Sequence, residues 1–350
     1  MSMRVLILTN NFLPGNKEAT KITLTEFEQK LQAKGHIVNI IAEKSIVGTL
    51  KKVRSLRKEN KTSFDIIHGF SAAPLLVIKT VLVKIIWYRK AQTIQTLKSY
   101  SKNILGSLYF SSILNAVNKI TVSTFAFKQK LVSQGCLKQK IEIIPSPVNS
   151  MRFKSLNKEE MKHKYCFQNK TVLFYYGSFY RTKGVPELIK ASKSILLEDP
   201  TRILLICPRH AVDKDIAELV LKLGLQNQVI FETREVNIVE YLNMAEVLIL
   251  PYTSLVGTEG NPSCLLEAAS CKIPIVTSDF EELREIVEPE KEVLMGPPGD
   301  IVKLEAQIRR ILADNQLRKK LIKNAFQKSK QFDSEIIAQK FIRLYQELVK

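Results

Sequence analysis

Two glutamates in the stretch GTEGNPSCLLEAASCKIPIVTSD, residues 257–279, have the type and spacing to hold a sugar ligand. Seven residues separate Glu259, in a glycine-flanked loop, from Glu267. Between them, Asn261 is a candidate N-cap, and Pro262 suits the first position of a helix, where its missing N–H is no loss. Carboxylates accept hydrogen bonds from hydroxyl groups, so the pair suits the sugar and ribose hydroxyls that flank a phosphate. The alternative is an ordinary loop residue and a solvated helix residue.

The start of that helix is itself a candidate anion site. The first amides of a helix have no partner inside it, and the positive end of the helix dipole lies there. A phosphate is well suited to such a position. The amides concerned belong to Ser263, Cys264 and Leu265.

A second stretch, YYGSFYRTKGVPELIKA at residues 175–191, supplies positive charge. A buried strand is predicted to end at Gly177, and the loop that follows contains Ser178, Arg181 and Lys183 before a new helix begins after Gly184. Cations at the carboxyl end of a strand would neutralise a diphosphate and stabilise it as a leaving group. A solvated basic turn is the alternative interpretation.

The elements around these residues alternate between strands and helices. The runs MRVLILTNNFLP (residues 3–14) and HIVNIIA (36–42) predict strands buried on both faces, and residues 18–35 between them have helical spacing with Gly35 as C-terminal cap. Further strands are expected at residues 64–71, 91–99, 119–124 and 140–147, with helices at 74–90 and 103–118. This pattern predicts one parallel α/β domain.

A second alternation begins at residue 170, with strands expected at 170–179, 202–208, 228–233, 245–252 and 273–279. Two prolines, Pro145 and Pro147, indicate a rigid exit from the first domain and a linker within 145–165. The fold class is therefore α/β, with two doubly wound parallel sheets facing a cleft. We predict a first domain at 1–150, a second at 151–330, and a final amphipathic helix at 331–350 that packs back toward the first domain.

Composition limits the functional classes. The chain has 350 residues, of which 45% are hydrophobic, and its five cysteines form no C-x-x-C pair. With no signal peptide and no apolar run long enough to span a bilayer, we expect a cytoplasmic protein. The net charge of +19 is uneven: residues 1–150 have 23 Lys+Arg against 7 Asp+Glu, or +16, and the remainder has 30 against 27, or +3. Such a field attracts anionic membranes, nucleic acids or phosphorylated molecules.

These stretches, taken in order, resemble the family-4 retaining glycosyltransferases, which have the GT-B fold. The resemblance rests on the glycine and the Lys-Gly pair that follow the strand at 170–179, on the E-x7-E spacing, and on VLMGPPGD and the final helix. It covers most of residues 170–348, and the first half resembles the family more loosely. The family resemblance implies sugar transfer from a nucleotide donor with retained anomeric configuration, and no metal or other cofactor.

The resemblance also implies roles for individual residues. Lys183 would hold the donor diphosphate, with Gly177, Ser178 and Arg181 beside it. Glu259 would contact the donor sugar, and Glu267 would bind the ribose. The amides near Ser263, Cys264 and Leu265 would bind the distal phosphate, close to Asn261.

The chain departs from the family pattern at several positions. Ser178 stands where the family has an arginine, and Lys98 replaces a histidine of the first domain. Gly15-Asn16 replaces a pair of glycines in the first loop, which we assign with Lys98 to the acceptor side. Lys272 replaces the glycine that ends the helix, where a left-handed conformation costs on the order of 1 kcal/mol.

The basic first half favours a lipid-linked or cell-surface glycan acceptor and peripheral attachment to an anionic membrane. The apolar segment at 74–90, with its lysines and Trp87, suits a membrane interface, although a core helix with snorkelling lysines is as plausible an interpretation. Two other functions stay open: a catalytically silent relative that binds nucleotide-sugars, and a nucleic-acid-associated protein. The nucleic-acid hypothesis is disfavoured because no aromatic residues alternate with the cations.

Overall fold

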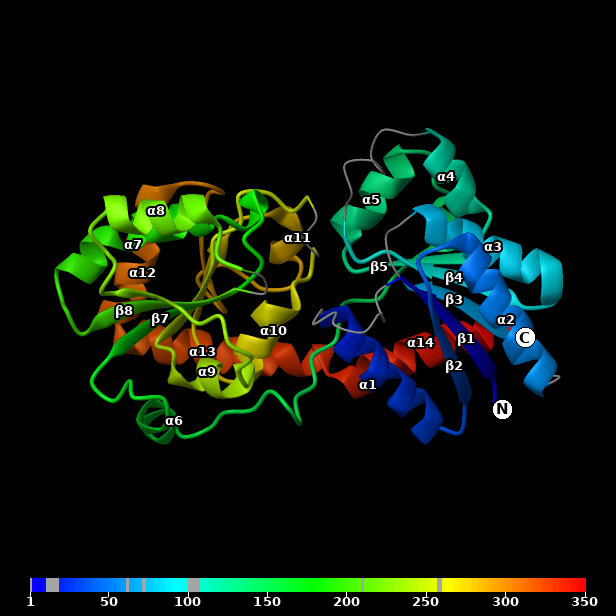
Figure 1. Ribbon diagram of the computed structural model, residues 1–350, viewed down its shortest axis with the longest axis horizontal. Coiled ribbons are helices and arrows are strands. Elements are labelled where there is room, and N and C mark those ends of the chain that lie inside the picture. Colours follow the sequence, from blue (N-terminus) through cyan, green and yellow to red (C-terminus); the bar gives the residue numbers. More distant parts are fainter. Residues whose placement is uncertain are drawn as a thin grey trace. The chain divides into compact units, whose positions relative to one another are not determined.

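The computed structural model describes residues 2–10, 19–60, 63–70, 74–99, 108–208, 211–256 and 260–350. The chain divides into two compact units, each built on a six-stranded sheet with helices on its faces (Figure 1). Unit 1 contains Met1–Pro147, Val256–Asn261 and Ser334–Lys350, and unit 2 contains Val148–Leu255 and Pro262–Asp333. The change of unit after Pro147 comes three residues before the boundary predicted from the sequence, and the final helix is part of unit 1.

Unit 1 has a wholly parallel sheet with the strand order β2-β1-β3-β4-β5-β6. Its strands are β1 (Arg4–Thr9), β2 (Ile37–Ala42), β3 (Ile66–Phe70), β4 (Gln92–Thr96), β5 (Lys119–Val122) and β6 (Ile141–Ile143). Its helices are α1 (Ala19–Ala33), α2 (Ile46–Asn60), α3 (Pro74–Trp87), α4 (Leu108–Asn115), α5 (Phe125–Ser133), the 3-10 turn η1 (Lys138–Lys140) and α14 (Ser334–Val349).

The C-terminal helix α14 completes the core of unit 1. Phe341 packs its ring 5.1 Å from that of Phe27 in α1, and Tyr345 is fully buried. His68, in β3, is also fully buried, and its Nδ1 lies 2.6 Å from the Tyr345 hydroxyl. Its Nε2 lies 2.6 Å from Oγ1 of Thr96 in β4. A hydrogen-bonded histidine therefore joins the last helix to the centre of the sheet.

Unit 2 has a second parallel sheet, with the order β12-β11-β10-β7-β8-β9. Its strands are β7 (Thr171–Gly177), β8 (Arg202–Pro208), β9 (Val229–Phe231), β10 (Val247–Leu250), β11 (Ile275–Ser278) and β12 (Leu294–Gly296). Its helices are α6 (Lys158–Lys164), α7 (Val185–Leu197), α8 (Lys214–Lys222), α9 (Ile238–Met244), α10 (Ser263–Ser270), α11 (Glu281–Arg284), α12 (Ile301–Ala313) and α13 (Asn315–Ser329), with 3-10 turns η2 (Arg181–Lys183) and η3 (Lys330–Phe332).

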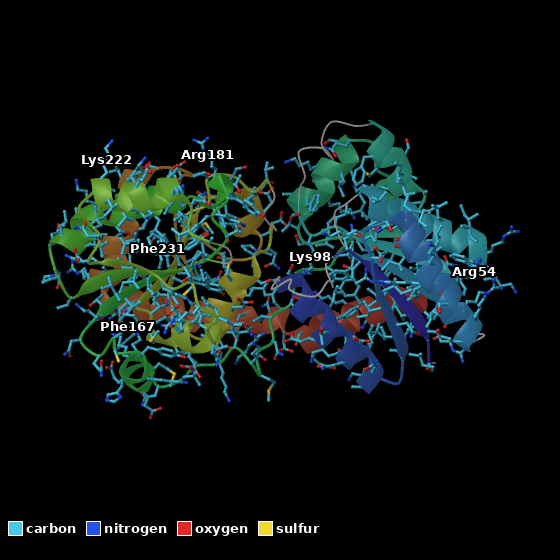
Figure 2. The ribbon with its side chains drawn as sticks, in the orientation of Figure 1. Arg54, Lys98, Phe167, Arg181, Lys222 and Phe231 are labelled. Atoms are coloured by element: carbon cyan, nitrogen blue, oxygen red, sulfur yellow. The ribbon has the colours of Figure 1, made fainter. Side chains whose placement is uncertain are left out.

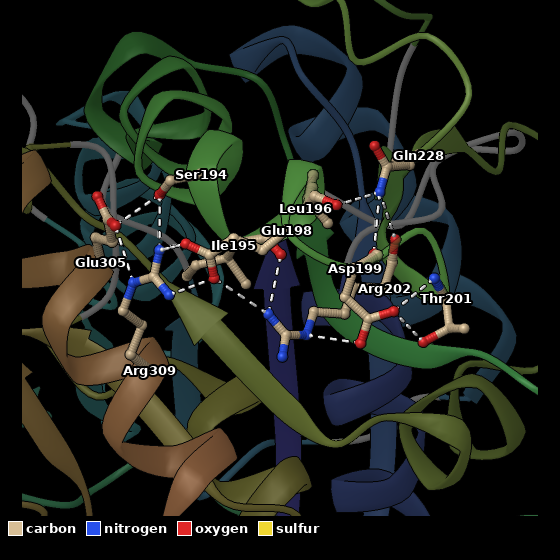
Figure 3. Close-up of polar contacts among 10 residues, drawn as sticks. All are labelled: Ser194, Ile195, Leu196, Glu198, Asp199, Thr201, Arg202, Gln228, Glu305 and Arg309. Carbon is tan, nitrogen blue, oxygen red and sulfur yellow. Dashed lines mark hydrogen bonds and ion pairs between the residues drawn. The ribbon is translucent and has the colours of Figure 1, made fainter.

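An ion-pair network fixes α7 against α12 on one face of this sheet. Arg309 of α12 donates to Glu198 just beyond α7, at 2.6 and 2.7 Å, and also to Glu305, at 2.9 Å (Figure 3). Arg202, at the start of β8, adds a hydrogen bond to the Ile195 carbonyl at 3.1 Å. The network anchors the carboxyl end of α7, whose amino end follows the basic loop.

Two predicted left-handed residues at helix ends are confirmed. Gly35 has φ +81° directly after α1, as expected for a cap, and Lys272 has φ +62° after α10. No helix in the described ranges is long and apolar enough to cross a membrane.

Candidate functional site

The strand order of unit 2 places a topological switch point between β7 and β10. From β7 the chain continues to β8 and β9 on one side, and β10 lies on the other. The connections therefore leave the two strands in opposite directions, and ligands of parallel sheets bind at the carboxyl ends of such strands. The two loops at this point follow Gly177 and Leu250.

The two loops are fastened to each other through their backbones. The Thr253 N–H donates to the Thr182 carbonyl at 3.1 Å, and the Thr253 hydroxyl donates to the Arg181 carbonyl at 3.0 Å. Gly184 has φ +68°, and a Cβ there would lie 1.7 Å from the Pro251 carbonyl oxygen. Only glycine permits both this conformation and this approach. The contact fixes the position of the first residue of α7 relative to the carboxyl edge of the sheet.

Lys183 is the cation that this geometry places between the loops. Its Nζ lies over the ring of Tyr252, 5.0 Å from the centroid. The Tyr252 hydroxyl lies 3.3 Å from Sγ of Cys264, in the first turn of α10. Tyr252 thus connects the basic loop to the start of the helix, and a cation at this distance from an aromatic face is stabilised by the ring quadrupole.

Glu267 is held by a tyrosine at the end of β7. The Tyr176 hydroxyl donates to a Glu267 carboxylate oxygen, and it also contacts the Cys264 carbonyl at 3.4 Å. Burial raises the pKa of Tyr176 well above its ordinary value, and the neighbouring Glu267 raises it further. The tyrosine therefore keeps its proton and acts as a fixed donor, leaving the half-buried carboxylate with acceptor capacity for another hydroxyl.

The start of α10 corrects the predicted capping. The helix begins at Ser263, with Pro262 in the N-cap position at φ −69° and ψ 127° and no side-chain cap. Asn261 does not cap it: its side chain is fully buried, and Nδ2 faces the Ser146 carbonyl at 3.4 Å. The Leu265 N–H donates to the Pro262 carbonyl at 3.1 Å. Of the three amides predicted to bind phosphate, that of Leu265 already has a partner at the start of the helix. The predicted phosphate site is therefore limited to the first residues of α10, with the Ser263 amide as the main candidate.

This site lies within a segment that matches a known sequence family. Residues 157–328 match the model of the group 1 glycosyl transferases, which covers the switch-point loops and α10. This segment, just under half of the chain, is the part that resembles the family. The fold of the whole chain is that of the GT-B glycosyltransferases: the Anabaena HepE structure with UDP and glucose superposes with a TM-score of 0.83 at 16% identity, over 99% of this chain and 100% of that one.

Two curated relatives show how far the similarity extends. A Campylobacter jejuni N,N'-diacetylbacillosaminyl-diphospho-undecaprenol alpha-1,3-N-acetylgalactosaminyltransferase is 28% identical over 71% of this chain and 65% of its own length. The N-acetyl-alpha-D-glucosaminyl L-malate synthase of Bacillus anthracis is 23% identical over 55% of this chain and 49% of its own length. The chain therefore spans about half to two thirds of the length of these relatives.

The structure also gives the positions of other residues predicted for this site. Arg181 is exposed and points outward from unit 2 (Figure 2). Ser178 is largely buried, and its carbonyl accepts a 2.7 Å hydrogen bond from Tyr175. Gly177, with φ +155°, leaves room for that tyrosine hydroxyl, which would lie 2.9 Å from a Cβ. Ser178 thus helps to shape the end of β7 through its backbone carbonyl.

The first-domain residues can be placed only in part. Lys98 follows β4 in unit 1, and its Nζ lies 5.3 Å from the centroid of the Phe70 ring, at the end of β3. It therefore stands at the carboxyl edge of the first sheet, where the sequence places it. Gly15, Asn16 and Glu259 lie outside the described residues.

Sequence reasoning missed the two tyrosines that connect the residues of this candidate site. Tyr176 is the last residue but one of β7, and Tyr252 lies two residues beyond β10. Each places a hydroxyl group at the carboxyl end of a central strand. That position is the one sequence signal that could have indicated them, because a tyrosine ring packs in the core while its hydroxyl group needs a hydrogen-bond partner.

Proposed function

We propose that this protein transfers a sugar from a nucleoside-diphosphate sugar to a hydroxyl acceptor, with retention of the anomeric configuration. The observation that carries the proposal is the arrangement at the switch point of unit 2. There Lys183, the first turn of α10 and Glu267 are connected through Tyr252, Tyr176 and Cys264. A cation, a helix amino terminus and an oriented carboxylate are the groups that a diphosphate with an attached ribose requires.

Each group has a distinct role in this proposal. Lys183 neutralises the charge that develops on the departing nucleoside diphosphate, which lowers the barrier most if the loop is already in place. The Ser263 amide binds the distal phosphate, and Glu267 accepts hydrogen bonds from the ribose hydroxyls. Glu259 contacts the donor sugar. The resemblance to retaining family members carries the stereochemistry, and it also carries the expectation that no metal is needed.

The acceptor we propose is a lipid-linked or cell-surface glycan precursor. The name of the Campylobacter relative gives a sugar carried on diphospho-undecaprenol, which supports a lipid-linked acceptor. The Bacillus relative is named for joining a sugar to L-malate, so a small hydroxy acid is the competing acceptor. Assays with both acceptor classes distinguish them.

We also propose that unit 1 attaches the enzyme to an anionic membrane from the cytoplasmic side. Helix α2 exposes a row of cations, and α3, which packs against it, exposes Ile85 and Ile86 at 54% and 47%. The exposed cations of α2 are Lys51, Lys52, Arg54, Arg57 and Lys58. Basic side chains beside exposed apolar ones suit an anionic interface. Sedimentation should show binding to phosphatidylglycerol vesicles and little to phosphatidylcholine vesicles, and a double Arg54→Glu, Arg57→Glu variant should lose it.

The donor site is tested by variants with matched controls. Lys183→Ala and Glu267→Gln should reduce sugar transfer at least 100-fold. The controls are Lys190→Ala in α7 and Glu218→Gln in α8, which change exposed side chains and should leave sugar transfer unchanged. A thermal-shift panel of UDP-, GDP- and dTDP-sugars identifies the donor, since ligand binding stabilises the native state. Chelator should not change the rate, and NMR of the product reports the anomeric configuration. Full activity in Lys183→Ala would refute the assignment of the site.

A further inference from the structure

A cationic pocket with a volume of about 280 Å³ lies in unit 2, remote from the switch-point loops that follow Gly177 and Leu250. Its lining includes Lys158 at the start of α6, Glu246 and Pro274, Lys272 after α10, and Arg318 in α13. Glu246 and Pro274 directly precede β10 and β11, so the pocket lies at the amino ends of these strands. The switch-point loops follow the carboxyl ends, at the opposite edge of the same sheet.

The one carboxylate of this lining already has internal partners. Lys162, whose side chain is 8% exposed, donates from Nζ to Glu246 Oε1 at 2.8 Å and to the Lys170 carbonyl at 2.8 Å. The Val172 N–H donates to Glu246 Oε2 at 2.6 Å. A buried lysine needs such a partner, because an unpaired buried charge is strongly destabilising. Glu246 therefore contributes a single negative charge that it shares between Lys162 and Lys158, which leaves the other cations of the pocket unbalanced by it.

Three cations belong to the pocket lining, namely Lys158, Lys272 and Arg318. Lys158 Nζ lies 3.5 Å from Glu246 Oε1. Burial lowers the pKa of Lys158, and nearby Lys162 and Arg318 lower it further, whereas Glu246 raises it. Arg318 donates to the Asn315 side chain, and no carboxylate in the described ranges forms an ion pair with it or with Lys272. The lining thus has an excess of positive charge.

Lys272 has an unusual backbone for its side chain. It adopts φ +62°, a conformation that glycine takes at helix ends without strain and that costs a lysine on the order of 1 kcal/mol. Its Nζ rests over the Phe326 ring, 4.9 Å from the centroid. A lysine kept at a strained position beside two other cations is consistent with a ligand that uses the charge.

We propose that this pocket binds the phosphate group of a small anionic metabolite, at a site separate from the donor site. Arg318 supplies a planar fork for two phosphate oxygens, and Lys158 and Lys272 supply point charges on either side. The volume fits a phosphate or a diphosphate with a small substituent, and is below the usual range for a nucleotide-sugar. The proposal does not depend on the sugar-transfer activity.

The experiment measures the binding of inorganic phosphate and pyrophosphate by calorimetry and thermal shift, with chloride matching the ionic strength. The parent protein should bind, and Arg318→Gln and Lys158→Gln should each weaken binding at least tenfold. Lys319→Gln is the matched control, since it removes an exposed cation from the adjacent position of α13. Lys272→Gly should weaken binding and also raise the melting temperature without phosphate, because it relieves the left-handed strain.

Lys183→Ala separates this pocket from the donor loops, which would also attract phosphate. The proposal requires Lys183→Ala to retain the binding that Arg318→Gln loses. Loss in Lys183→Ala with retention in Arg318→Gln would place the anion at the donor loops and overturn the proposal. Equal affinity in Arg318→Gln and Lys319→Gln, or no binding by the parent, would overturn it as well.

Discussion

The buried His68 should make the stability of unit 1 depend on pH. The size of the change in the free energy of unfolding can be worked out from the structure. His68 has no exposed surface, and burial lowers its pKa from 6.5 to about 3. An unfolded chain with the ordinary pKa takes up a proton below about pH 6.5, and the folded unit does not. Stability is therefore complete above pH 6.5 and is lost as the pH falls toward 3. Linkage gives a loss of about 2 kcal/mol for this one group between pH 8 and pH 5.

The variant His68→Gln removes the titrating group and keeps a polar side chain between Thr96 and Tyr345. At pH 8 it should be less stable than the parent by about 1 to 3 kcal/mol, because buried hydrogen bonds are disturbed. Between pH 8 and pH 5 the parent should lose about 2 kcal/mol more than the variant, so the difference between them nearly disappears. His36 also has a pKa lowered by burial, but it is common to both proteins and cancels in the comparison.

Urea unfolding followed by tryptophan fluorescence is the assay. Trp87 is the single tryptophan of the protein, and it packs against the α2–α3 side of the unit 1 core, so the signal reports the unit that contains His68. Tyr345→Phe is the control: it removes one hydrogen bond and leaves the burial that causes the pKa shift, so the pH dependence should persist. An equal loss in parent and His68→Gln would refute the reasoning.

Three further predictions concern unit 2. Gly184→Ala should lower the free energy of unfolding by about 2 kcal/mol or more and abolish donor binding in thermal-shift assays, because its Cβ would strike the Pro251 carbonyl. Tyr176→Phe should raise the KM for the donor about tenfold with a small change in kcat, since it removes the hydrogen bond that orients Glu267. Arg309→Ala should cost less than about 1 kcal/mol in urea unfolding, because Arg309 and Glu198 are 37% and 52% exposed.

Strand positions could be predicted from the sequence because the strands of both units are buried on two faces. Such strands are runs of apolar residues that end in polar or glycine punctuation, as in β1 and β7. Helix α2 could not be predicted in this way. Among its residues 46–59, whose burial is described, Thr49 and Val53 alone are fully buried. The helix also has Gly48 in its first turn and five exposed cations, so its helical period is too weak to detect.

The candidate site could be predicted as two separate segments, and the structure supplies the link between them. Lys183 and Glu267 were found from local patterns in the chain. Their connection runs through Tyr176 in β7 and Tyr252 just beyond β10. The two strands are neighbours because β10 pairs with β7 across 69 intervening residues. A tyrosine near a buried strand is predicted as a core residue, because its hydroxyl partner lies on another element. The prediction of the helix cap was wrong for a local reason. Pro262 adopts an extended ψ, so α10 begins at Ser263, one residue later than predicted.

Two left-handed residues show why the chain departs from the family pattern at some positions and follows it at others. At Gly184 the positive φ coincides with a backbone approach that would put a Cβ 1.7 Å from Pro251, so any side chain would displace the donor loops. At Lys272 the side chain is exposed and only the dihedral angle is unfavourable, at a cost on the order of 1 kcal/mol. A cost of that size is tolerable in a stable domain, whereas a collision with a buried carbonyl is not. Glycine is therefore required where it sets the geometry of the switch-point loops, and the end of α10 tolerates a lysine that adds positive charge to the cationic pocket of unit 2.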